Sequence, residues 1–85
     1  MVVQEKGDYM GRMLGFSGYV ENSDFYIEPQ EYYDAFNFLV ELAVGSDETV
    51  FYIGRAVDNG YDFELKDVMK VVWNGYDWVI RFEER

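Results

Sequence analysis

The fold is decided by the stretch Val68-Met69-Lys70-Val71-Val72-Trp73-Asn74-Gly75-Tyr76-Asp77-Trp78-Val79-Ile80-Arg81-Phe82. Two runs with β character flank an Asn-Gly dipeptide, which is the strongest short-range hairpin signal. A two-residue loop would create an apolar face by pairing Trp73 with Tyr76, Val71 with Trp78, and Met69 with Ile80. The other face would pair Val72 with Asp77, Lys70 with Val79, Val68 with Arg81, and Lys66 with Glu83. The alternation predicts a half-buried antiparallel hairpin.

A second Asn-Gly, at Asn59-Gly60, stands between two earlier runs of the same character. It joins the predicted strand 49–57 to residues 61–65, and the chain then continues through 68–73. A two-residue loop here places Arg55 opposite Glu64, a favourable pair of charges. The two turns together predict a three-strand meander.

A helix is predicted at 29–44, upstream of the meander. Pro29 suits the first helical position, Glu28 and Glu31 suit the positive end of the helix dipole, and Gly45 suits the stop. Apolar residues recur at helical spacing, and a narrow polar stripe lies opposite. The apolar stripe contains Tyr32, Ala35, Phe36, Leu39, Leu42 and Ala43, and the polar one Gln30, Asp34, Asn37 and Glu41.

The N-terminal part completes the predicted fold. Residues 9–20 are extended but rich in glycine, 21–24 suit a turn, and 25–27 suit a short strand. The order β-β-α-β-β-β predicts a single acidic α+β domain over 1–85, with one antiparallel sheet and the helix packed on one of its faces.

Composition narrows the function classes. Hydrophobic residues make up 49% of the 85 residues and aromatics 20%, which is typical of a folded domain rather than a disordered acidic tail. Histidine and cysteine are absent, so the usual near-neutral base, the best nucleophile and thiolate metal ligands are missing. We therefore expect no enzyme activity, no cofactor and no metal. The loop 58–62 superficially suits calcium, but a hairpin turn explains it.

Net charge is −10, and its distribution is uneven. Between Met13 and Gly54 there is no Lys or Arg, whereas the same stretch contains eight acidic residues. The negative electrostatic field of such a protein repels nucleic acid and anionic membranes and attracts basic surfaces. We therefore expect a basic protein partner, with neither direct nucleic-acid binding nor membrane binding. Acidity also serves solubility, and this alternative stays open.

The lack of cysteine, and of a basic and apolar start over residues 1–8, favours a cytoplasmic protein. The charge pattern resembles that of the small acidic DNA-mimic inhibitors of phage, such as anti-CRISPR and anti-restriction proteins. The resemblance is one of composition, without a motif of a particular family. It implies evasion of host defence through the basic groove of a nucleic-acid enzyme. The expected contact residues are the acids Glu21, Asp24, Glu28, Glu31, Asp34, Glu41, Asp47 and Glu48, with Tyr26 and Tyr33 beside them.

Aromatic residues support a competing hypothesis. By alternation Trp73, Tyr76 and Trp78 belong to the core face of the last hairpin, although exposed they would form a contact patch for protein or sugar. The surplus of Tyr and Phe elsewhere exceeds what one small core needs. The alternative function is therefore a structural or assembly module that forms a homodimer or larger assembly through exposed aromatics and a sheet edge.

Overall fold

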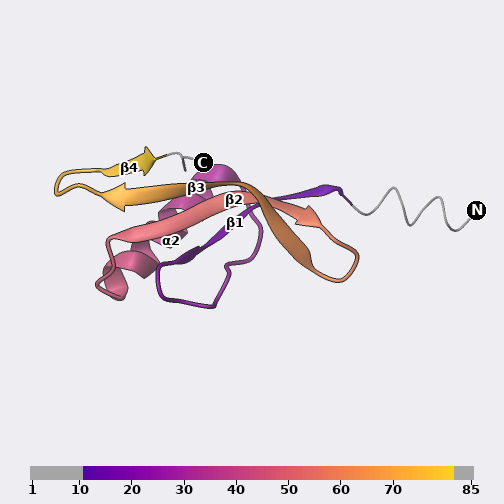
Figure 1. The fold of residues 1–85 in the computed structure, drawn as a ribbon, viewed down its shortest axis with the longest axis horizontal. Coiled ribbons are helices and arrows are strands. Elements are labelled where there is room, and N and C mark those ends of the chain that lie inside the picture. Colours follow the sequence, from indigo (N-terminus) through magenta and orange to yellow (C-terminus); the bar gives the residue numbers. More distant parts are fainter. Residues whose placement is uncertain (1–10, 82–85) are drawn as a thin grey trace, which may run out of the picture.

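The computed structural model describes residues 11–81, which form one helix and four strands (Figure 1). The strands are β1 (Met13–Val20), β2 (Val50–Asp58), β3 (Phe63–Trp73) and β4 (Trp78–Arg81), and the helix is α2 (Tyr32–Gly45). All neighbouring strands are antiparallel, in the order β1-β2-β3-β4. The predicted α+β class is confirmed, whereas the predicted count of five strands is wrong. Residues 9 and 10 of the predicted first strand lie outside the described residues.

The segment 25–27 is not a strand. Ile27 is instead attached to the outer edge of β1 by single bonds: its N–H donates to the Gly18 carbonyl (3.1 Å), and the buried Ser17 hydroxyl donates to its carbonyl (2.6 Å). Further on, Phe16 and Gln30 exchange two backbone hydrogen bonds of 2.7 and 3.0 Å. The Phe16–Gln30 pair would place Glu28 opposite Gly18, but Ile27 is the residue that donates there, so the two attachments differ in register by one residue and a continuous ladder does not form.

The helix begins three residues later than predicted. Glu31 is the N-cap residue, and its side chain makes no capping hydrogen bond. Pro29 falls before the helix, where the chain bridges to β1. At the other end Gly45 is the last helical residue, and the chain turns away through Asp47, whose φ of 60° lies in the left-handed region.

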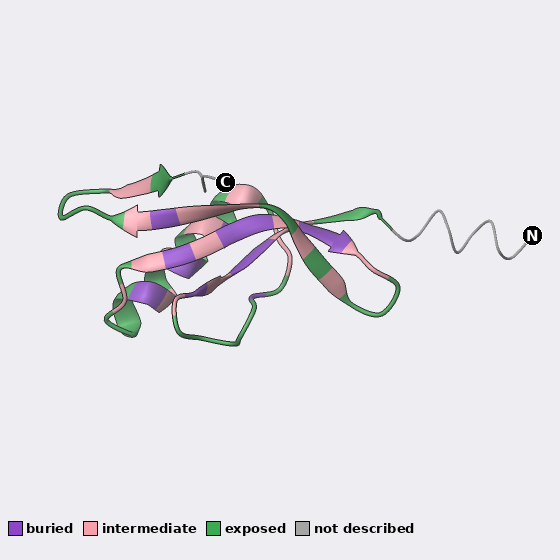
Figure 2. Cartoon of the chain, viewed as in Figure 1, coloured by how far each residue is buried: buried purple, intermediate pink, exposed green. Residues whose placement is uncertain are grey.

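The core lies between α2 and the sheet (Figure 2). Ala35, Leu39 and Ala43 are completely buried, and Tyr32, Phe36 and Leu42 pack beside them, as the apolar stripe predicted. The edge of the Phe36 ring meets Phe51 of β2 at a centroid distance of 5.3 Å. The buried apolar residues of this core are Val20, Ile27, Ala35, Leu39, Ala43, Phe51, Ile53 and Val71.

Both hairpins have four-residue loops instead of the predicted two-residue loops. The loops share the sequence Asn-Gly-Tyr-Asp and the same hydrogen bonds: Oδ1 of Asn59 accepts from the N–H groups of residues 61 and 62, and Oδ1 of Asn74 from those of 76 and 77. Gly60 and Gly75 have φ values of 101° and 103°, which favour glycine. Each asparagine therefore starts a longer turn.

The longer loops move both registers by two residues. Trp73 is opposite Trp78, and Arg55 is opposite Lys66 rather than Glu64. A shift of two leaves the side chains of residues 68–73 and 78–81 on their predicted faces, so the faces of the last hairpin survive although its pairs were wrong. The pairs of the last hairpin are Val72 with Val79, Val71 with Ile80, and Lys70 with Arg81. The predicted partner Glu83 lies outside the described residues.

Strand β3 is one bent strand, the middle strand of the predicted three-strand meander. The register of β2 against β3 shifts between Ile53 and Arg55, with one extra residue on β3. At this bulge Asp67 has φ 52°, and its carboxylate forms a salt bridge of 2.6 Å with Arg55. The bulge bends the β2–β3 hairpin away from the helical end of the sheet (Figure 1).

Candidate partner-binding surface

All eight predicted contact acids lie on α2 or on the segments that connect it to the sheet, and none lies on a strand. They form three groups: one near each end of α2 and one along its exposed side. Glu21, Asp24, Asp47 and Glu48 belong to the loops near the C-terminal end of the helix. Glu28 and Glu31 flank its N-terminal end, and Asp34 and Glu41 are exposed along its length.

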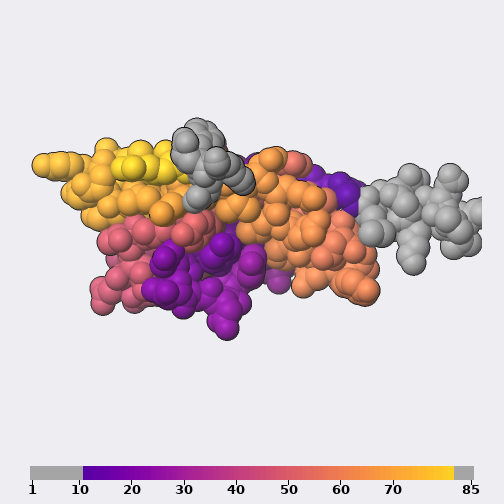
Figure 3. All heavy atoms as spheres, in the orientation of Figure 1, coloured from indigo at the N-terminus to yellow at the C-terminus, as the bar shows by residue number. Residues whose placement is uncertain are grey.

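Two loops that are distant in sequence meet at the C-terminal end of α2. The amide of Asn22 donates to Oε2 of Glu48 at 3.4 Å, and the N–H of Glu21 donates to the Val50 carbonyl at 3.0 Å. In the space-filling view the loop after β1 lies against the segment between α2 and β2 (Figure 3). The contact brings Glu21 and Glu48 to the same end of the molecule.

The exposed acids of the helix share one side. Glu31, Asp34 and Glu41 are spaced by three and seven residues, which places them in one stripe along α2. The stripe extends roughly 15 Å, at a rise of about 1.5 Å per residue. It offers a linear array of carboxylates to solvent.

The basic residues lie elsewhere. Arg55 binds Asp67 (2.6 Å) and Lys66 binds Glu64 (3.3 Å); in residues 11–81 these are the two salt bridges, and neither uses one of the eight acids. A cross-strand row on the sheet consists of Tyr19, Tyr52, Lys70 and Arg81. Because side chains alternate along a strand and the neighbouring Phe51 and Val71 face the helix, this row faces away from the helix. The eight predicted contact acids and this basic row thus lie on different sides of the sheet.

The two predicted tyrosines are not brought together. Tyr26 packs on Tyr19 (5.0 Å between ring centroids) and meets the edge of Phe63 (6.3 Å), so it belongs to the sheet side. Tyr33 stands on the first turn of α2, 77% exposed, with its ring against Tyr32 at 5.7 Å. Tyr33 therefore lies beside the acidic stripe.

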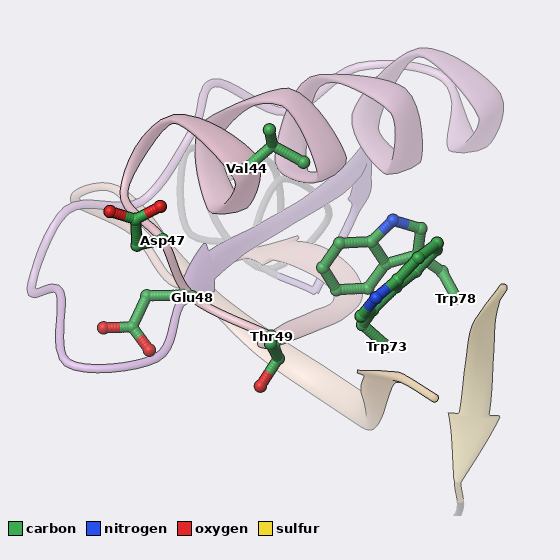
Figure 4. A pocket seen from close by; sticks show the side chains of 6 residues that line it. All are labelled: Val44, Asp47, Glu48, Thr49, Trp73 and Trp78. Atoms are coloured by element: carbon green, nitrogen blue, oxygen red, sulfur yellow. The ribbon is translucent and has the colours of Figure 1, made fainter. Parts of the chain in front are cut away.

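A surface cavity adjoins the acidic loops (Figure 4). It measures about 300 Å³ and lies between the C-terminal end of α2 and the β3–β4 hairpin. Its lining residues are Val44, Asp47, Glu48, Thr49, Trp73 and Trp78. Sequence reasoning placed both tryptophans in the core and did not find this cavity.

The interpretation of the last hairpin as entirely core needs correction. Tyr76 is 85% exposed because it belongs to the four-residue loop, and Trp73 is 38% exposed at the end of its strand. Trp78 is half-buried and packs on Phe51 at 5.2 Å. Trp78 is therefore a core contact, Tyr76 is solvent-exposed, and Trp73 is at the surface of the cavity.

The arrangement of the acidic residues bears on metal binding. In the described part of the chain no three acidic residues are arranged to hold a metal ion. In the loop after β2, the Asp58 carboxylate accepts the N–H of Gly60 (2.8 Å), so turn formation occupies it. The pKa of the Tyr32 hydroxyl is raised, first by burial and second by the neighbouring Tyr33.

No protein-family model matches this chain, and no similar curated protein or solved structure was found. Over residues 11–81 no helix has the length and apolar character that crossing a lipid bilayer requires. The function is therefore inferred from the surface itself.

Proposed function

We propose that this protein is a non-enzymatic acidic binding protein that occupies the basic groove of a nucleic-acid-binding enzyme, as an inhibitor that imitates DNA. The observation that carries the proposal is the placement of eight acids on the helix layer, with both salt bridges of residues 11–81 made by other acids. Grooves lined by Lys and Arg select oxyanions in general, so carboxylates on a rigid scaffold compete with phosphates.

Rigidity supports this function over a purely solubilising role. The acidic stripe lies on a helix whose opposite side is anchored in the core by the fully buried Ala35, Leu39 and Ala43. The loops at its end are joined by the Asn22–Glu48 hydrogen bond. A preorganised array loses little side-chain and loop entropy on binding. Long-range attraction between the acidic surface and a basic groove also raises the association rate.

The biological setting that fits such an inhibitor is a phage or mobile-element product acting in the cytoplasm against a host defence nuclease of the anti-CRISPR or anti-restriction kind. In that setting the partner would be an enzyme that itself binds DNA or RNA. The acids would substitute for the phosphates of its substrate, with Tyr33 as a flanking contact. Tyr26 would contact the partner from the side of the sheet.

A matched pair of variants tests the proposal. Asp34→Asn with Glu41→Gln removes two charges from the stripe, while Asp62→Asn with Asp77→Asn removes two exposed charges from the hairpin loops. Each protein would be immobilised, used to capture partners from a nuclease-treated lysate, and tested for displacement of DNA from the captured protein. We expect the stripe variant to bind at least about tenfold more weakly, since close interfacial charge pairs contribute ~1.5 kcal/mol or more each.

The loop variant should stay within about twofold of the original affinity, and added salt should weaken binding steeply. Equal binding by the stripe variant, or a captured protein that does not bind nucleic acid, would contradict the proposal. Self-association is the competing function, and the exposed Ile80 and Tyr76 near the short edge strand β4 favour it. Apolar self-association would hold or strengthen in salt, and sedimentation at two salt concentrations would show it.

A further inference from the structure

The cavity beside the acidic loops combines two aromatic walls with a negative rim. Trp73 and Trp78, the chain's two tryptophans, are cross-strand partners with ring centroids 5.4 Å apart and planes inclined by 49°. Figure 4 shows both indoles on one side of the cavity and Asp47 and Glu48 on the other side, where their carboxylates point outward, away from the indoles. An electron-rich indole face attracts cations, and tryptophan does so most strongly among the aromatic side chains.

The two indoles have different supports. Trp78 packs on Phe51 of the core at 5.2 Å, which fixes its orientation. Trp73 is 38% exposed and is held by its backbone N–H, which donates to the Thr49 carbonyl at 2.9 Å. One ring therefore forms the base of the cavity, and the other offers surface to a ligand.

Three sources of negative potential meet at the rim. Asp47 and Glu48 are acidic side chains, and neither takes part in the salt bridges formed within residues 11–81, although Oε2 of Glu48 accepts from the Asn22 amide. The third source is the C-terminal end of α2, where the backbone carbonyls form the negative end of the helix dipole. The last turn of α2 contains no basic residue to compensate that dipole.

We infer that this cavity binds an arginine side chain of the partner protein. A guanidinium group is planar, stacks on aromatic faces, is weakly hydrated, and donates several hydrogen bonds to carboxylates, whereas the lysine ammonium is a compact and strongly hydrated charge. The cavity volume of about 300 Å³ is at the lower end of the range of roughly 300–1,000 Å³ for small-molecule sites. That volume suits one inserted side chain. The inference rests on the proposed function and names the group of the partner that anchors the complex.

The test uses the short peptide acetyl-Gly-Arg-Gly-amide and the counterparts with lysine or citrulline at the centre. Because the chain has two tryptophans and both line the cavity, their indole N–H signals in NMR and their fluorescence report on this site alone. We expect a saturable shift with the arginine peptide and a dissociation constant at least threefold higher for lysine. The citrulline peptide, which is neutral and similar in shape, should cause no saturable shift.

Charge variants separate a local site from general attraction. Asp47→Asn with Glu48→Gln should weaken arginine-peptide binding by about fivefold or more, while Asp34→Asn with Glu41→Gln should change it less than twofold. Asparagine tolerates the left-handed backbone at position 47, so the first variant keeps the loop. Trp73→Leu should abolish binding, read from the signal of Trp78, and an unchanged backbone spectrum outside the hairpin would show that the fold persists.

Several outcomes would overturn the inference: no saturable shift, equal binding of the citrulline peptide, or equal weakening by both charge variants. The outcomes also distinguish it from the proposed function. If the protein binds the arginine peptide but its stripe variant still captures the partner, the arginine site in the cavity is retained and the proposed DNA-mimic function is rejected. If the stripe variant loses its partner but the Asp47 and Glu48 variant keeps full partner affinity, the DNA-mimic function is supported and the arginine anchor is rejected.

Discussion

Replacing Ser17 by alanine should loosen the loop that joins β1 to the helix. In residues 11–81 Ser17 is the single buried polar side chain, with no exposed surface, and its hydroxyl donates to the Ile27 carbonyl at 2.6 Å. Ile27 is itself 1% exposed, so the substitution leaves a buried carbonyl without this donor. The cost of an unsatisfied buried group is about 1–3 kcal/mol. A loss of ~2 kcal/mol would lower Tm by roughly 8–16 °C for a chain of this size.

The control lies in the same loop. Ser23 is exposed and accepts the N–H of Phe25 at 3.1 Å, so Ser23→Ala should cost less than about 0.5 kcal/mol, as for most surface substitutions. Urea unfolding followed by circular dichroism gives both free energies of unfolding. Amide exchange should also speed up at Ile27 in the Ser17 variant. If Ser17→Ala unfolds within about 0.5 kcal/mol of the original protein, the hydrogen bond does not hold the loop.

Two further substitutions test the packing of β1 and the ionisation of α2. Gly18→Ala should destabilise the fold by about 3 kcal/mol or more, because the added Cβ would overlap the Tyr52 carbonyl oxygen. Gly45→Ala, with open space around it, should be neutral or slightly stabilising. Urea unfolding measures both free energies, and similar values would refute the packing argument. Burial raises the pKa of Tyr32 above its ordinary 10.0, so the unfolded chain loses this proton first and stability should fall as pH rises from about 10 toward the folded pKa. Tyr32→Phe should remove this component of the pH dependence, whereas Tyr33→Phe should only reduce it, because burial is the larger cause of the Tyr32 shift. Equal curves for the original protein and Tyr32→Phe would contradict the shift.

The sequence predicted the composition of the core better than the pairing of strands. Burial of a helical residue follows from the spacing of apolar residues along the sequence, and this spacing alone predicted the buried stripe that includes Leu39. Strand register depends on loop length, and an Asn-Gly dipeptide does not specify it. Here Asn74 and Asn59 each accept two backbone N–H groups, which stabilises a four-residue loop. The repeated Asn-Gly-Tyr-Asp sequence was the available signal, and it indicates that both turns share one structure.

The segment 25–27 shows where local pattern fails. Its apolar residues suit a strand, but a strand needs a ladder of backbone partners. For residues 25–27 the sheet edge provides one backbone acceptor, the Gly18 carbonyl, and the next attachment, between Phe16 and Gln30, is out of register with it by one residue. The tertiary position of Ile27 in the core then decides the conformation. The candidate cavity was missed for a similar reason, because its walls come from the end of α2 and from the β3–β4 hairpin, which the sequence does not place together.

The position of Asp47 and Glu48 is unfavourable for the helix, and this favours a role in binding. Carboxylates beside the negative end of a helix dipole each cost about 0.3–1 kcal/mol, and basic residues there would gain a similar amount. The last turn of α2 has no such basic residue, although lysine or arginine at the exposed Val44 would meet no steric obstacle of the core. Residues that locally oppose stability are found most often at functional sites. A guanidinium group supplied by a partner would compensate both the carboxylates and the helix end, so the bound state would relieve a cost that the free protein carries.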